Sequence, residues 1–148
     1  MTDRRLCLGV SIAAAVLAIL LGSHPAMAAA IVVGVFIPDV DSLSERFHRS
    51  WLFHTFLAPT IAYKIIVDLN VPHSPLLVEL VHFAALGMAV HLVFDYVYPR
   101  KKQHPGSEWP IQPSFGSDPW GIILLGLTWP VQWFLYVAPA FLPWLFIG

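Results

Sequence analysis

The sequence predicts an all-α protein, an integral membrane helical bundle of about five transmembrane helices, within a single domain, residues 1–148. Hydrophobic residues make up 57% of the chain and charged residues only 11%, whereas soluble domains average about 25% charged residues. A core of this size cannot bury so much apolar surface, so we expect the excess to face a lipid bilayer. The net charge of -1 gives no indication of a nucleic-acid partner.

The first two apolar segments are separated by a short polar turn. Residues 6–22 carry no charge and are long enough for a short first span. A secretory signal peptide is the alternative, because Arg4 and Arg5 precede the apolar run and residues 26–28 offer a cleavage site. The second segment, 26–38, reaches only about 20 Å as a helix, so it either crosses with a loop that dips into the membrane or is re-entrant.

Three further spans are expected, and two polar loops separate them from one another and from the second segment. The spans are residues 51–69, 76–99 and 119–147; the loops are the polar loop 39–50 and the basic loop 100–117. Prolines interrupt the last span, which predicts either one kinked crossing with an interfacial tail or a tight hairpin.

Nearly all the positively charged residues are predicted to lie on one side of the membrane. If the first two segments both cross, seven of the eight Lys and Arg residues lie on the side of the N-terminus: Arg4, Arg5, Arg46, Arg49, Arg100, Lys101 and Lys102. Cytoplasmic loops carry an excess of Lys and Arg. The sequence therefore predicts a multi-pass plasma (inner) membrane protein with a cytoplasmic N-terminus.

The same topology brings six metal-type side chains to one membrane depth on the cytoplasmic side. They are Asp39, Asp41, His48, His54, His91 and Asp95. Ionisable groups next to hydrocarbon are costly and are usually kept there for function. Imidazoles and carboxylates together are ligands of Zn, Mn or Fe rather than of Ca. We therefore expect a site for one or two divalent metal ions.

The spacing of these residues supports a shared site. His91 and Asp95 are four residues apart and share one helix face, so both can reach one ion, or Asp95 can orient the imidazole. Asp39 and Asp41 repel each other unless a cation lies between them.

Two neighbours of the predicted ligands are candidates for catalysis. Glu45 lies between the acidic pair and His48, where it could act as a general base. Arg49 follows His48 and could hold a substrate anion. Lipid-phosphate anchoring is the alternative role for Arg49, and a solvated loop acid is the alternative for Glu45.

Three motifs resemble those of the predicted membrane-bound metal-dependent hydrolases, a family that includes the LexA-regulated inner-membrane proteins of bacteria. The motifs are PDVD at 38–41, HRSWLFHT at 48–55 and GMAVHLVFD at 87–95. The family pattern reads roughly PDxD, then HR followed closely by THS, then GxxxHLxxD. This chain departs from it at Ser42, Phe53 and Thr55, and an early histidine of the family has no clear counterpart. The resemblance implies a hydrolase with the metal ligands named above.

The order of the ligands is also similar to that of zinc-dependent phospholipase C enzymes, which favours a phosphorylated or lipid-like substrate. Two other functions fit the sequence. His54 and His91 could be axial ligands of a haem in an electron-transfer protein. Alternatively, the chain is a non-catalytic membrane scaffold or transport component, which would need a homo-oligomer or another partner.

Overall fold

The computed structural model describes residues 2–20, 22–38, 55–97 and 127–147, and the side chains of 8–20, 22–38, 55–94 and 127–147. All regular structure in this part of the chain is helical, so the all-α class is confirmed for it. The helices are α1 (Thr2–Leu20), α2 (Pro25–Phe36), α3 (Leu57–Asp68), α4 (Ser74–Val97) and a C-terminal helix, Leu127–Ile147, which includes the π-helical segment η2 (Trp133–Phe141) and α6 (Leu142–Ile147).

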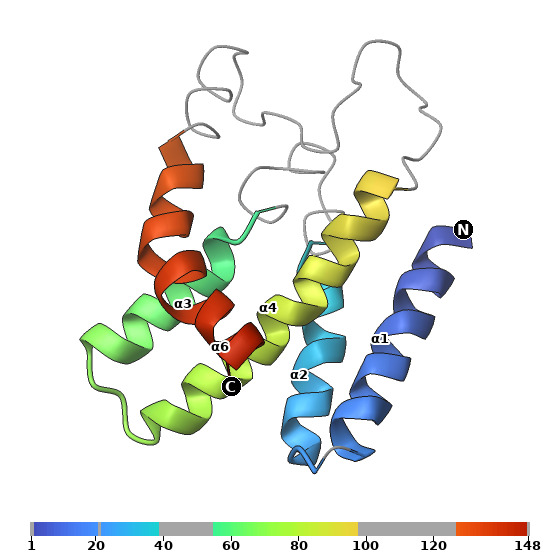
Figure 1. Ribbon diagram of the computed structural model, residues 1–148, viewed down its shortest axis with the longest axis horizontal. Helices are drawn as coiled ribbons and strands as arrows, with labels where there is room; N and C mark the ends of the chain where they lie inside the picture. The colour runs from blue at the N-terminus through green and yellow to red at the C-terminus, as the bar shows by residue number, and fades with distance from the viewer. Residues whose placement is uncertain (1, 21, 39–54, 98–126, 148) are drawn as a thin grey trace.

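The helices form two hairpins, α1–α2 and α3–α4, and the C-terminal helix packs on the second hairpin (Figure 1). Helix α4 is central, because it packs against α1, α2 and α3. The N-terminus, the ends of α2 and α4, and the starts of α3 and the C-terminal helix all lie at one end of the bundle, called the upper end here (Figure 1). The two short turns within the hairpins lie at the opposite, lower end.

Both hairpin turns begin with a residue in the left-handed conformation. Gly22 has a φ of 90°, and the amide of Ser23 donates a hydrogen bond to Ala18 O at 2.9 Å. Asn70 has a φ of 46°, and the amide that follows it donates to Ile66 O at 3.1 Å. This six-to-one pattern is a Schellman motif, which satisfies carbonyls at a helix end and favours Gly or Asn. The left-handed residue and the Schellman hydrogen bonds therefore explain why each helix ends where it does.

Two glycines bring α2 and α4 into backbone contact. A Cβ atom at Gly34 would overlap Ala84 O, and one at Gly87 would overlap Ile31 O. The two contacts are reciprocal, as expected for helices that run in the same direction, because carbonyls point along the chain and Cα–Cβ bonds point back. Small residues at such contacts allow the close packing that holds helices together in membranes. Helices α2 and α4 are thus a tightly packed parallel pair.

The C-terminal helix is continuous from Leu127 to Ile147 and widens in the middle. Pro139 lies inside η2; a proline ring clashes with the carbonyl four residues earlier in an α-helix. In η2 the hydrogen bonds run to the fifth residue instead, as from Leu142 N to Val137 O. Residues five apart then share a face, and Tyr136 and Phe141 are both buried. The expected alternative of a tight hairpin is therefore wrong for residues 127–147.

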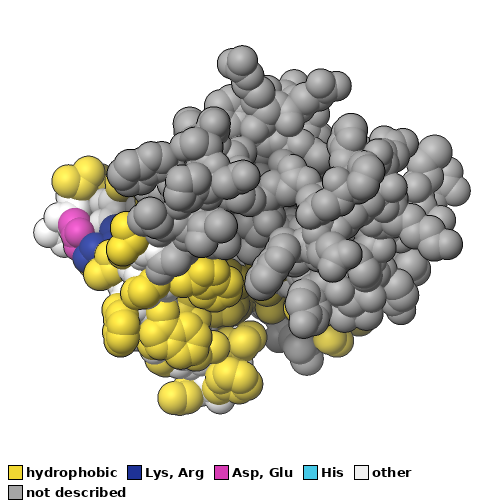
Figure 2. Space-filling view, turned by 90° about the horizontal axis from the view of Figure 1, so that it is seen from above, with side chains coloured by type: hydrophobic (Ala, Val, Ile, Leu, Met, Phe, Trp, Pro, Cys, Tyr) yellow, Lys and Arg dark blue, Asp and Glu magenta, His cyan; other side chains and the backbone are white. Residues whose placement is uncertain are grey.

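Two of the described helices are long and apolar enough to cross a membrane, Ser74–Phe94 and Leu127–Ile147. Within the most apolar 18 residues of each stretch, 28% and 17% are buried inside the protein. Shorter apolar helices cover Leu8–Leu20 and Pro25–Phe36. Figure 2 views the molecule from above. On the face that it shows, hydrophobic side chains cover most of the described surface, and Lys or Arg and Asp or Glu side chains lie at one edge.

Candidate functional site

Most of the site residues expected from the sequence lie outside the part of the chain that the structure describes. These are Asp39, Asp41, Glu45, His48, Arg49 and His54. Asp95 lies in α4, but its side chain is not among those described. His91 is the one candidate whose side chain is described, and it is 3% exposed.

His91 is buried four residues after Gly87, at which α4 contacts α2. Gly87 and Gly34 contact the opposite backbones, and His91 and Pro38 each follow their glycine by four residues. His91 lies about one helical turn beyond Gly87 within α4, and Pro38 lies just beyond the end of α2 at Phe36. Both are buried, Pro38 to less than 2% exposure. Pro38 directly precedes Asp39 in the sequence.

The metal site itself stays a prediction. Among the described residues, no three His, Cys, Asp or Glu side chains lie close enough together to hold a metal ion. Only one of the six expected ligands, His91, belongs to that set. A buried imidazole is a common metal ligand, and the donor types of the other five fit Zn, Mn or Fe.

Polar side chains are buried near the upper end of the bundle. At the start of α3, Thr55 and Thr60 are 1% and 2% exposed, and Thr60 Oγ1 donates to Phe56 O at 2.6 Å. In the C-terminal helix, Gln132 is 1% exposed and its Nε2 donates to Thr128 O at 2.9 Å. Gln132 Oε1 has no hydrogen-bond partner among the described residues. A buried amide oxygen without a hydrogen-bond donor costs free energy, so Gln132 destabilises the folded state at this position.

Sequence reasoning missed a second buried polar group, in the middle of the second hairpin. His82 Nδ1 lies 3.0 Å from Tyr136 Oη, and the two side chains are 5% and 0% exposed. The His82 ring stacks against Tyr136 and Trp144, with centroid distances of 5.6 and 5.1 Å. Tyr63 and Phe141 complete this group, which we call the aromatic cluster. It joins α3, α4 and the C-terminal helix.

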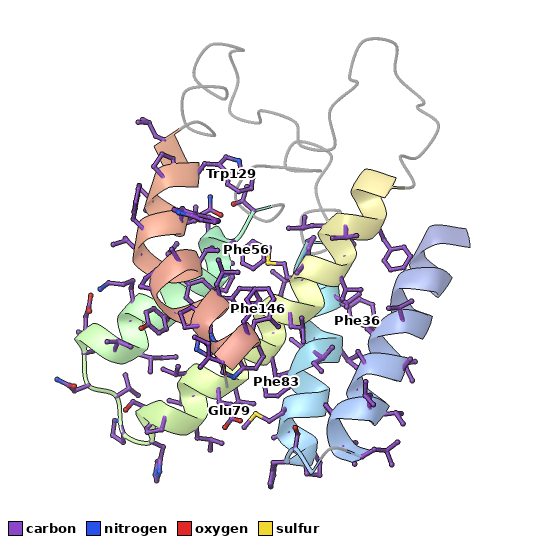
Figure 3. The ribbon with its side chains drawn as sticks, in the orientation of Figure 1. Phe36, Phe56, Glu79, Phe83, Trp129 and Phe146 are labelled. Carbon is purple, nitrogen blue, oxygen red and sulfur yellow. The ribbon has the colours of Figure 1, made fainter. Side chains whose placement is uncertain are left out.

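Further aromatic side chains surround the aromatic cluster. Phe83 packs edge-on against Trp144 at 5.0 Å, and Phe56 lies 5.5 Å from Phe141. Figure 3 shows both phenylalanines among the side chains between α4 and the C-terminal helix. The sequence signal for this region was a histidine within an apolar span, which by itself indicates no partner.

No known protein family matches the chain, and no match was found among curated proteins or among solved structures. The resemblance to membrane-bound metal-dependent hydrolases therefore stands on the three motifs alone.

Proposed function

We propose that the chain is a multi-pass protein of the plasma membrane. Large apolar side chains of α1 and of the C-terminal helix face outward, at exposures of 49% to 85%: Ile12, Val16, Leu17, Leu20, Leu127, Trp129, Phe134, Phe146 and Ile147. Each Å² of such surface costs about 25 cal/mol in water. Extended apolar surface of this kind marks contact with a membrane or a partner, and lipid is the partner that fits helices on opposite sides of the bundle.

Two tryptophans support an interfacial position for the upper end. Trp129 and Trp133 are one turn apart near the start of the C-terminal helix and are 49% and 45% exposed. Tryptophan is enriched where hydrocarbon meets the headgroups. A site at the upper end would then open at the membrane surface, within reach of an amphipathic substrate.

Within this bundle we infer a metal-dependent hydrolase whose site is at the upper, cytoplasmic end. The proposed ligands of one or two Zn, Mn or Fe ions are Asp39, Asp41, His48, His54, His91 and Asp95. The observation that carries the proposal is that His91 and Pro38 are both buried, each four residues after a glycine at which α4 and α2 are in backbone contact. It supports an approach of the third motif, which contains His91, to the first, which begins at Pro38.

The chemistry assigned to this site follows from its residue types. A bound divalent cation would polarise the phosphoryl or carbonyl oxygen of a substrate as a Lewis acid. Arg49 would hold the negative charge of a phosphorylated, lipid-like substrate through its planar guanidinium. Glu45, as general base, would accept the proton of the water molecule that attacks the substrate.

Metal content tests the site directly. We expect protein purified in detergent without chelator to carry about one or two equivalents of Zn, Mn or Fe by plasma mass spectrometry. His91→Ala and Asp95→Ala should lose most of this metal. The matched control is His73→Asn, which removes an exposed histidine from the lower turn and keeps a residue that tolerates its φ of 61°.

Each outcome separates the possible functions. Metal-free wild type would refute the hydrolase and leave the membrane scaffold, whereas a haem would show at once in the visible absorbance. Equal metal in wild type and His91→Ala would exclude His91 as a ligand. Metal-loaded protein that hydrolyses neither phosphatidate nor other phosphoester lipids in mixed micelles would keep the metal site and reject the proposed substrate class.

A further inference from the structure

We propose that the C-terminal helix has two registers, and that the hydrogen bond between His82 and Tyr136 holds it in the one seen here. This inference depends on the contacts of the helix and not on the hydrolase proposal. A register change would turn the upper part of the helix relative to its lower part, and so connect the aromatic cluster with the polar upper end of the core.

The spacing of the buried residues defines the present register. Gln132, Tyr136 and Phe141 are all at most 4% exposed, and they are four and five residues apart. The spacing of five is that of η2, whereas an uninterrupted α-helix keeps a face by steps of three and four. If Phe141 stays in place and η2 closes into α-helix, steps of four bring Val137 and Trp133 into the positions of Tyr136 and Gln132.

Some features of the C-terminal helix favour the π register, and others favour the α-helical register. The Tyr136–His82 hydrogen bond, the stacking of Tyr136 on His82 and the ring of Pro139 favour the π register. The more compact α-helical geometry favours the other register, since π segments are rare. Burial of Gln132 Oε1 without a donor also opposes the present register. Because these contributions have opposite signs, a single buried hydrogen bond can decide between the two.

The register change can be told apart from a loss of packing. It would bury some side chains and expose others, whereas looser packing would expose them all. Each residue above η2 takes the surroundings of the residue before it, a rotation of about 100°. Residue 132 becomes exposed, as Val131 is now at 45%, and residue 133 becomes buried. Residue 131 stays on the outside.

Cysteine accessibility measures this exchange. In a Cys7→Ala background, Val131→Cys, Gln132→Cys and Trp133→Cys are made one at a time and treated with N-ethylmaleimide in detergent micelles. With Tyr136 intact, we expect position 132 to react slowly and positions 131 and 133 to react fast. With Tyr136→Phe added, position 132 should accelerate and position 133 should slow, each by about tenfold, as a shifted two-state population requires. Position 131 should not change.

Two further variants protect the test against a loss of folding. His82→Phe removes the same hydrogen bond from the other partner, and Pro139→Ala removes the ring that favours η2, so both should give the same exchange. Circular dichroism and size exclusion check that each variant keeps its helices. Unchanged rates at 132 and 133 in all three variants would overturn the proposal, and so would acceleration at both positions, because that indicates loosened packing without a change of register.

Discussion

Two glycines in and after α1 show how backbone conformation limits the sequence. Gly22 has a φ of 90°, where a Cβ atom is strained. Gly9 lies inside α1, and a Cβ atom there would meet no atom within 4 Å. The two glycines are therefore opposite cases, one required in the turn after α1 and one dispensable within α1.

We expect Gly22→Ala to lower the free energy of unfolding by about 1 kcal/mol, because alanine is strained in the left-handed region. Gly9→Ala should raise it by about 0.5–1 kcal/mol through helix propensity. Thermal unfolding in detergent, followed by circular dichroism, measures both. A destabilising Gly9→Ala would show that this face of α1 is in contact with something beyond the described residues.

The two buried histidines of α4 differ in how well the sequence predicts their partners. His91 was a candidate because Asp95 follows it by four residues, a pattern readable within one helix. The partner of His82 is 54 residues away in the sequence. That pairing depends on the π turns of η2, whose effect on register cannot be read from hydrophobic spacing.

Among the elements, α2 and α4 have the closest contact. Gly34 and Gly87 each face a backbone carbonyl of the other helix, and neither carbonyl can move aside as a flexible side chain could. The helices can approach so closely because each glycine carries a hydrogen atom where alanine would carry a methyl group.

We expect Gly34→Ala and Gly87→Ala each to cost about 1–3 kcal/mol of stability, because overpacking forces the helices apart. The double variant should cost less than the sum, since helices already separated by one methyl group accommodate the second. Val33→Ala, on an exposed position of α2, is the control and should have little effect. Denaturation in detergent provides the four values, and strict additivity would contradict a shared contact.

The helices themselves were largely predictable from apolar runs and their breaks. The expected segment 76–99 corresponds to α4, Ser74–Val97, and the segment 26–38 to α2, Pro25–Phe36. The outcome at Pro139 was not predictable in the same way, because a proline can end, kink or widen a helix. Here the packing of Tyr136 and Phe141 against His82 accompanies a widened helix.

For the whole molecule, orientation in the membrane is the property that the charges predict most directly. Lys64 is the one Lys or Arg assigned to the other side. It forms an ion pair with Asp68 at 2.8 Å, on the lower half of α3, with side-chain exposures of 37% and 55%. The pair cancels its charge, so Lys64 does little to oppose the orientation that the other seven cations predict.

Reporter fusions test the orientation. We expect alkaline phosphatase to be active when fused after His73, in the lower turn, because it needs an oxidising compartment for its disulfides. Fused after Lys102, it should be inactive, and green fluorescent protein at the same point should be fluorescent. The reverse pattern would place the predicted metal site outside the cytoplasm.

The lengths of the connections give the bundle two unlike ends. Residues 21–24 and 69–73 join the helices at the lower end, and both turns are closed by main-chain hydrogen bonds. The short connections keep the two helices of each hairpin close together at that end. Any separation of the two helices within a hairpin, for a lipid tail or another guest, would therefore have to start at the upper end, as the arms of tweezers part away from their joint.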